Sequence, residues 1–103
     1  MRMDTSQPTG RCRRLPSFSA LRAFEQAATL GSFKDAATAL CLSTSAVSHQ
    51  IRSLEKDLGL MLFDRHAHGV ETTQAAREYL RFVQSAFNHL ERGTSVVRFY
   101  SSS

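Results

Sequence analysis

The chain has 103 residues, 42% of them hydrophobic, and a net charge of +4, which suits one small domain with a modest core. It contains no apolar run of about 18 residues, so we expect no transmembrane helix, and its charged start lacks the apolar segment of a secretory signal. Two cysteines far apart in the sequence, Cys12 and Cys41, argue against a disulfide scaffold and suit a reducing cytoplasm.

The positive charge is concentrated at the N-terminus. Four of the thirteen basic residues lie in the first part of the chain: Arg2, Arg11, Arg13 and Arg14. We predict that residues 1–16 form a disordered basic arm that ends at Pro16. From Leu15 onward, nine basic residues stand against eight acidic ones. A nucleic-acid-binding surface on the folded part must therefore depend on where the charges lie and not on their sum.

The first predicted helix runs from about residue 18 to residue 30 and ends at Gly31. Its inward side chains are predicted to be Phe18, Leu21, Phe24 and Ala28.

A second, short helix follows Ser32, which stands at capping-box spacing from Asp35. Its predicted inward side chains are Phe33, Ala36, Ala37 and Leu40. Two of these are alanine, so another helix can approach closely.

The third predicted helix covers residues 44–58, with Ser43 as its N-cap and Gly59 as its stop. One narrow apolar stripe contains Val47, Ile51, Leu54 and Leu58. The opposite face carries hydroxyl, imidazole and cationic side chains: Thr44, Ser45, Ser48, His49, Arg52, Ser53 and Lys56. Two short helices joined by a tight turn, the second rich in small polar side chains, are typical of a helix-turn-helix. An ordinary amphipathic helix with a solvated polar face has the same spacing.

The next segment, residues 62–72, is predicted to be a wing. The stretches 62–65 and 70–72 have the pattern of two short strands, and Gly69 supplies the turn between them. His66 and His68 have the types of metal ligands but lack a convincing third ligand, and we expect no metal or other cofactor.

We also expect no enzymatic activity. Ser48 and His49 are adjacent on one helix, so their side chains diverge by about 100° and cannot work together as in a catalytic triad.

The last element is a long helix over about residues 74–91, with Thr73 as its N-cap, within a linker segment 73–92. Gly93 is predicted to end it and to leave residues 93–103 as a tail. Its apolar residues cover more than one stripe, which indicates two partners. One is the chain's own three-helix unit. The other is a second copy, for which the predicted contact residues are Tyr79, Phe82, Val83, Ala86, Phe87 and Leu90. Burial within a larger protein is the alternative.

Three stretches resemble the N-terminal DNA-binding domain of the LysR-type bacterial transcriptional regulators: LPSFSALRAFEQAATLGSF, DAATALCLSTSAVSHQIRSLEKDLG and LFDRHAHGVETTQAA. The resemblance covers residues 15–92 without gaps, about three quarters of the chain. It implies a mainly α fold: a winged helix-turn-helix over residues 17–72, with a three-helix core and a two-stranded wing, followed by a long linker helix. Full-length relatives carry a further effector domain that is absent from this sequence, so we expect no small-molecule effector site here.

The resemblance also implies residue roles. The recognition helix 44–58 enters the major groove of double-stranded DNA, and the wing 62–72 lies at the minor groove. The side chains expected to contact DNA are Ser43, Thr44, Ser45, Ser48, His49, Arg52, Arg65 and His68. Thr44 stands where family members often have Gln, which leaves base choice there open. His68 stands where Arg is usual, so its minor-groove contact should be weaker and dependent on pH.

The function implied is regulation of transcription in the bacterial cytoplasm, at the nucleoid. A homodimer formed through the linker helix would bind an inverted-repeat promoter site. A module that forms mixed dimers with a full-length relative, without reading DNA itself, is the alternative.

Overall fold

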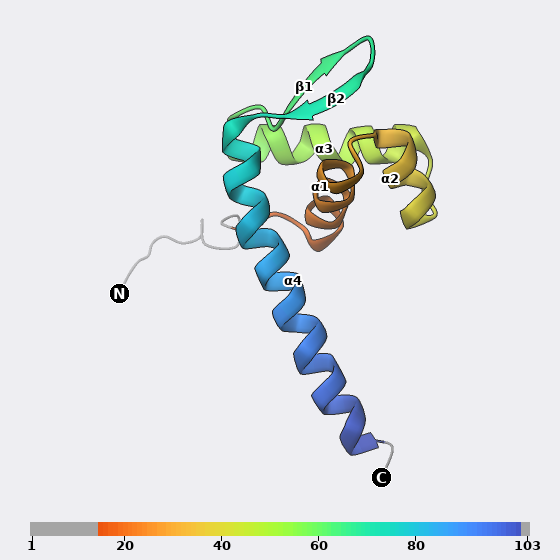
Figure 1. Cartoon of the computed structure of the whole chain (residues 1–103), viewed down its shortest axis with the longest axis vertical. Coiled ribbons are helices and arrows are strands. Elements are labelled where there is room, and N and C mark those ends of the chain that lie inside the picture. The colour runs from red at the N-terminus through yellow and green to blue at the C-terminus, as the bar shows by residue number, and fades with distance from the viewer. Residues whose placement is uncertain (1–14, 102–103) are drawn as a thin grey trace, which may run out of the picture.

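The computed structural model describes residues 15–101. Its elements are α1 (Phe18–Leu30), α2 (Phe33–Leu40), α3 (Thr44–Leu58), β1 (Phe63–His66), β2 (Gly69–Thr72) and α4 (Gln74–Ser101). Figure 1 shows α1, α2 and α3 as a three-helix body, with the β1–β2 hairpin above it and α4 running away from it. The predicted fold class, a mainly α winged helix-turn-helix followed by a long helix, is confirmed. Most of the predicted basic arm lies outside the described residues.

Local capping fixes the helices of the body. Each begins after a serine whose hydroxyl oxygen accepts a hydrogen bond from the backbone N–H three residues later, at 3.0–3.1 Å: Ser17, Ser32 and Ser43. The turn between α2 and α3 is made by Cys41, whose φ of 58° is left-handed. Its N–H donates to the carbonyl of Thr38, and the next N–H donates to Ala37. This tight turn places α3 directly against α1 and α2.

The core is organised around Phe24. Its ring lies 5.9 Å from that of Phe63 at the base of the wing and 5.6 Å from that of Tyr79 on α4. The alanines predicted to let another helix approach α2, Ala36 and Ala37, are both buried. Phe24 therefore joins the body, the wing and α4 in one hydrophobic cluster.

One predicted core residue is placed differently. Phe18 is 61% exposed, whereas the buried side of α1 passes through Ala23 and Ala27. At 100° per residue, Phe18 lies more than 90° around the helix from both alanines. It packs instead at the edge of the core, with its ring edge-on to Phe87 at 5.3 Å.

The wing is an antiparallel pair in which Phe63 faces Thr72 and His66 faces Gly69. β1 is shifted by one residue from the predicted stretch 62–65, whereas β2 begins one residue before the predicted stretch 70–72 and ends where predicted. Leu62 lies just before β1, where its N–H donates to the side chain of Glu55 and its carbonyl accepts from the N–H of Thr73. Gly69, with φ of 127°, is the first residue of β2 and directly follows the loop of residues 67–68, so it borders the turn and does not lie within it as predicted.

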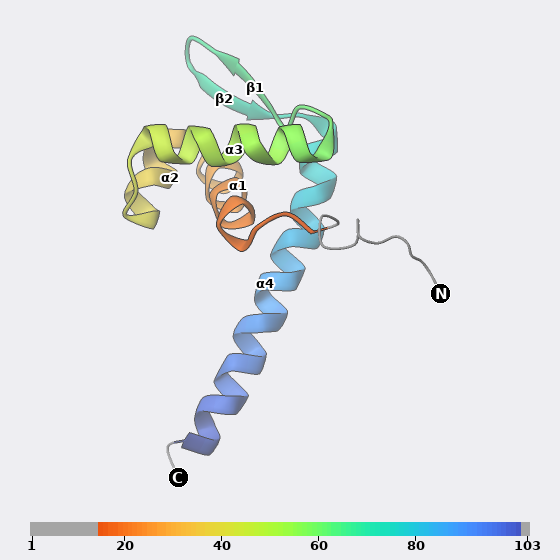
Figure 2. The same cartoon turned by 180° about the vertical axis from the view of Figure 1, so that it is seen from behind.

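The long helix begins as predicted and ends later. The Thr73 hydroxyl accepts from the N–H of Ala76 at 3.2 Å and donates to the carbonyl of Met61 at 2.9 Å. The predicted end at Gly93 is wrong, because α4 continues to Ser101. Glycine inside a helix costs only about 1 kcal/mol relative to alanine, which does not stop a helix that continues favourably on both sides. Figures 1 and 2 show the last turns extending well beyond the body.

Within residues 15–101 the structure contains no helix that is both long and apolar enough to cross a membrane.

Candidate nucleic-acid interface

The outward face of α3 is a continuous polar stripe. Four exposed side chains recur at spacings of four, three and four, which places them along one side of the helix: Ser45, His49, Arg52 and Lys56. The predicted apolar stripe lies on the other side, where Val47, Ile51 and Leu54 are fully buried. Lys56 was not among the predicted contact residues, although its spacing from Arg52 was enough to place it there.

The N-terminal turns of α3 bring most of the predicted contact residues together. Thr44 and Ser45 are exposed at the start of the helix, and Ser48 is half-buried one turn later. The hydroxyl oxygen of Ser43 accepts from the N–H of Ala46, and the hydroxyl can still donate one hydrogen bond and accept one more. This end of α3 therefore presents short side chains that can both donate and accept hydrogen bonds.

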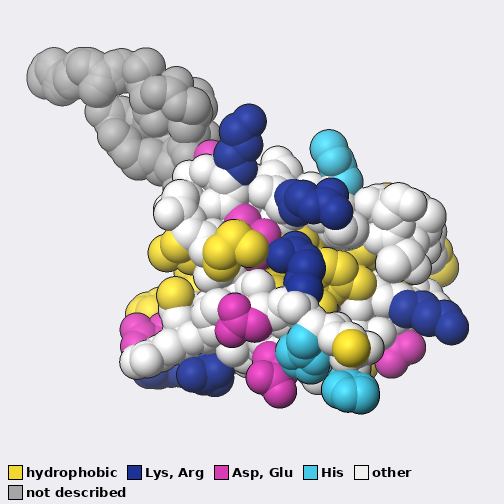
Figure 3. Space-filling view, turned by 90° about the horizontal axis from the view of Figure 1, so that it is seen from above, with side chains coloured by type: hydrophobic (Ala, Val, Ile, Leu, Met, Phe, Trp, Pro, Cys, Tyr) yellow, Lys and Arg dark blue, Asp and Glu magenta, His cyan; other side chains and the backbone are white. Residues whose placement is uncertain are grey.

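The wing lies on the same side of the molecule as α3 (Figures 1 and 2). Seen from that side, Lys, Arg and His side chains are distributed over the face, with acidic side chains among them (Figure 3). His68 is exposed in the two-residue loop, and its N–H donates to Nδ1 of His66 at 3.3 Å. Nε2 of His66 lies 3.8 Å from a carboxylate oxygen of Glu71 on the facing strand. Protonation of His66 would make this contact an ion pair.

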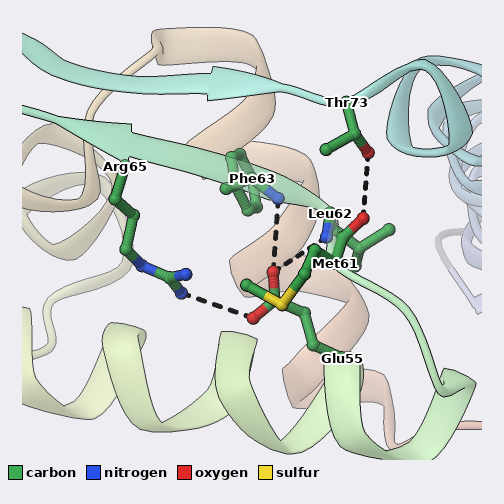
Figure 4. Close-up of polar contacts among 6 residues, drawn as sticks. All are labelled: Glu55, Met61, Leu62, Phe63, Arg65 and Thr73. Carbon is green, nitrogen blue, oxygen red and sulfur yellow. Dashed lines mark hydrogen bonds and ion pairs between the residues drawn. The ribbon is translucent and has the colours of Figure 1, made fainter.

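A buried carboxylate connects the recognition helix to the wing (Figure 4). Glu55, in the last turn of α3, is only 6% exposed. Its Oε2 accepts from the backbone N–H groups of Leu62 at 2.8 Å and Phe63 at 3.2 Å. Its Oε1 lies 3.4 Å from Nη2 of Arg65. One side chain of α3 thus holds the start of β1 at three points.

Arg65 is held from two sides. Besides its contact with Glu55, its guanidinium lies 5.3 Å from the ring centroid of Phe33 on α2. The same Phe33 ring is edge-on to Phe63 at 5.3 Å. Arg65 is predicted to contact DNA, and in the structure its guanidinium contacts side chains of both α2 and α3.

Glu55 was missed as a site residue. The sequence did carry a signal, since an acidic residue follows Leu54 on the buried side of α3 and lies one turn after Ile51. A carboxylate in that position requires buried donors. Which donors they are could not be inferred, because Leu62 and Phe63 meet Glu55 only after the chain turns back at Gly59.

The predicted dimer contacts divide into two groups. Val83 and Phe87 are buried against the chain's own body, which removes them from the surface available to a second copy. The reason is helical phase: both follow Ala76 at intervals of about seven and eleven residues, on the side that faces α1. Phe82 and Leu90 are 70% and 56% exposed.

Tyr79 lies between these groups. It is half-buried, packed on Phe24, and borders an open groove that is lined mainly by apolar residues: Leu58, Leu60, Leu62, Ala75 and Phe82. Burial raises the pKa of the Tyr79 hydroxyl above its usual 10.0, and the charge of Asp57 raises it further.

Known proteins share this sequence pattern and this geometry. Residues 18–77 match the family described as "Bacterial regulatory helix-turn-helix protein, lysR family". An uncharacterized HTH-type transcriptional regulator of Sinorhizobium fredii, y4mQ, is 49% identical over 81 residues, which are 79% of this chain and 27% of that protein. The glycine cleavage system transcriptional activator of Escherichia coli K12 is 42% identical over 82 residues, 80% of this chain and 27% of the activator.

A solved structure described as a BenM_DBD/benA site 1 DNA complex is similar with a TM-score of 0.77 and 26% identity. The similarity covers 84% of this chain and 98% of that one. The chain thus spans about a quarter of the length of these two regulators and nearly all of that solved chain. With the family match covering more than half of its residues, the chain belongs to the lysR family of bacterial regulatory helix-turn-helix proteins.

Proposed function

We propose that this chain binds double-stranded DNA in a sequence-specific manner and acts in the regulation of transcription. The observation that carries the proposal is the exposed, hydrogen-bonding start of α3 on the same face as a wing that is fixed to that helix. A helix of this kind fits the major groove, and a neighbouring hairpin can reach an adjacent groove. The DNA complex of a similar domain supports this interpretation.

Within α3 the side chains divide by reach and charge. Thr44, Ser45 and His49 can donate to or accept from base edges, which is how sequence is distinguished in the major groove. Arg52 and Lys56 are exposed cations suited to phosphate oxygens, which position the protein without reading sequence. We therefore assign specificity to the first turns of α3 and general affinity to the cations that follow.

The wing contributes a weaker contact in this proposal. His68 lies at the exposed loop, and an imidazole attracts a narrow minor groove less strongly than the permanently charged guanidinium of arginine would. His68→Arg should tighten binding at pH 8 by several-fold. Equal affinity of the two proteins at pH 8 would argue against a minor-groove contact at this loop.

A homodimer is the proposed binding unit. A stripe of exposed residues along α4 contains Phe82, Ala86 and Leu90. These residues are symmetric about Ala86, so two antiparallel helices could pack with Phe82 against the partner's Leu90 and a small residue at the crossing point. Such an interface has two-fold symmetry, and the bound DNA would then be an inverted repeat with half-sites about one helical turn apart or slightly more.

The direct test is selection of bound sequences from random DNA, followed by affinity measurements at several salt concentrations. Enriched inverted repeats would support the proposal. Arg52→Ala should weaken binding to selected and random DNA alike and lower the salt dependence by about one unit of slope. His49→Ala should cost about 1–3 kcal/mol on the selected site and much less on random DNA.

Arg92→Ala is a matched control for the loss of one exposed arginine, since it lies on α4 away from α3. It should leave the salt slope nearly unchanged. No enrichment of any sequence, combined with pairing to a full-length relative, would overturn the proposal and favour a mixed-dimer module. Equal losses on both DNAs for His49→Ala would exclude that residue from base reading.

A further inference from the structure

Glu55 lies where the wing joins the rest of the molecule. The wing strands pair with each other, and a two-stranded hairpin is only marginally stable on its own. Its direction relative to α3 must therefore be fixed by contacts at its base, which include both the packing of Phe63 in the core and hydrogen bonds. On the β1 side, Glu55 supplies the hydrogen bonds, through the N–H groups of Leu62 and Phe63 and the guanidinium of Arg65.

The position of Glu55 makes these bonds a link between the two DNA-facing elements. Thr44 and Glu55 are eleven residues apart on one helix, or roughly 16 Å along its axis. Because a helix is rigid over this length, a wing held at Glu55 keeps a constant distance and angle to side chains at the other end. Figure 4 shows the carboxylate lying between α3 and the start of β1.

The link between α3 and the wing is a buried carboxylate, that of Glu55, bound to three donor groups. A carboxylate receives two backbone donors on one oxygen and a guanidinium on the other, and charge-assisted bonds of this kind are stronger than neutral ones. The guanidinium of Arg65 also lies 5.3 Å from the ring centroid of Phe33, within the range of a cation–π contact. Helices α2 and α3 thus restrain the same strand.

We infer that Glu55 is a positioning residue for DNA recognition: with Arg65, it sets the orientation of the wing relative to α3, so that both can occupy their grooves at once. The orientation of the wing is inferred from the contacts of Glu55. Its effect on DNA binding rests on the proposed function.

Glu55→Gln is the informative substitution. The glutamine carbonyl oxygen can still accept from Leu62 and Phe63, whereas its amide N–H₂ faces the donors of Arg65 and cannot bind them. It also removes a negative charge near the DNA-facing surface. The loss of a negative charge by itself would raise the affinity for DNA, whereas a more mobile wing would lower it. The direction of the change in affinity therefore separates the two explanations.

We expect Glu55→Gln to lower affinity for the selected site about tenfold, since two fixed contacts become one fixed and one mobile contact. Base preference should be lost at the flanking positions under the wing and kept at the positions read by α3. Glu91→Gln removes an equal charge from an exposed position on α4 and should bind like the wild type. Unchanged or tighter binding by Glu55→Gln, with flanking preference intact, would overturn the inference.

Arg65→Lys tests whether the effect on DNA binding comes from charge alone or from the contacts of the guanidinium group. Lysine keeps the positive charge but lacks the planar group that stacks on Phe33 and reaches Glu55. If Arg65 acts through the wing, Arg65→Lys should reproduce the loss of flanking preference, and the double variant with Glu55→Gln should add little to either single change. Additive losses would mean that the two residues act separately.

A measurement without DNA keeps this inference distinct from the proposed function. Residual dipolar couplings report the direction of β1 and β2 relative to α3, and hydrogen exchange reports the N–H groups of Leu62 and Phe63. In Glu55→Gln the couplings of the wing should become smaller while those of α1 to α3 stay unchanged. A fixed wing in this variant would refute the inference even if DNA binding is confirmed. If the wing is mobile in this variant and the wild-type protein binds no DNA, the role of Glu55 in orienting the wing is upheld and the proposed function is refuted.

Discussion

Two sides of α4 have nearly the same residue types and opposite surroundings. The inward side places Ala76, Val83 and Phe87 in the core of the chain's own body. The outward side leaves Phe82 exposed. The two phenylalanines are five residues apart, so they point about 140° apart on the helix. The comparison shows that apolar character on a helix indicates burial of some kind, but only the packing decides whether the partner is the same chain or another.

The strongest test of the inward side is Phe87→Ala. The ring of Phe87 contacts Phe18 at 5.3 Å and lies 5.5 Å below the guanidinium of Arg22, so its removal leaves a cavity between α1 and α4. We expect a loss of about 3 kcal/mol in the free energy of unfolding, measured by urea denaturation. A loss below about 1 kcal/mol would show that α4 is not anchored there.

The outward side is tested by Phe82→Glu. A charge at this exposed position should be tolerated in the monomer but not against an apolar partner, so the dimer should dissociate while the body stays folded. Sedimentation gives the oligomeric state, and the urea midpoint of the monomer reports folding. Asn88→Glu adds the same charge away from the stripe of Phe82, Ala86 and Leu90 and should remain dimeric. A Phe82→Glu protein that sediments as a dimer would place the interface elsewhere.

Tyr79 lies between the two sides of α4, and its hydroxyl makes the stability of the folded chain depend on pH. Burial, and then the charge of Asp57, raises the pKa of Tyr79 in the folded state above 10.0. Above pH 10 the unfolded chain therefore loses the proton first. Its contribution to stability is complete below pH 10 and is lost as pH rises through the folded-state pKa, with a slope of at most about 1.4 kcal/mol per pH unit. Tyr79→Phe should show a smaller decline between pH 9.5 and 11 in urea titrations. Identical profiles would mean that the hydroxyl is as solvated in the folded state as in the unfolded one.

The smallest expected effect concerns Gly93, beyond the region where α4 packs on the body. A Cβ added at Gly93 would meet no atom within 4 Å, and its backbone is helical. Gly93→Ala should therefore raise helix content near the C-terminus and stabilise the last turns by about 0.5–1 kcal/mol. Hydrogen exchange of residues 94–100 measures this directly. Faster exchange in the variant would indicate that the glycine is needed for a contact with a partner.

Local chemistry alone determined much of this protein. The serines before each helix of the body, Gly31 and Gly59 after two of them, and the apolar stripe of α3 were sufficient to place these helices and the polar face of α3. Capping and helical periodicity depend on residues within a few positions of one another, so they can be identified from the sequence.

Only the tertiary structure decided the rest. The sequence predicts a helix end at Gly93 because glycine has a low helix propensity. That propensity takes no account of the residues after Gly93, which continue the helix. The sequence predicts that Phe87 contacts a second copy. Periodicity shows which residues share a face of α4, but it does not show whether that face packs on the same chain or on another. The bonds of Glu55 to the start of β1 join residues separated by a turn and by the end of a helix. Contacts of this kind arise from how elements pack in three dimensions, and no local pattern in the sequence records them.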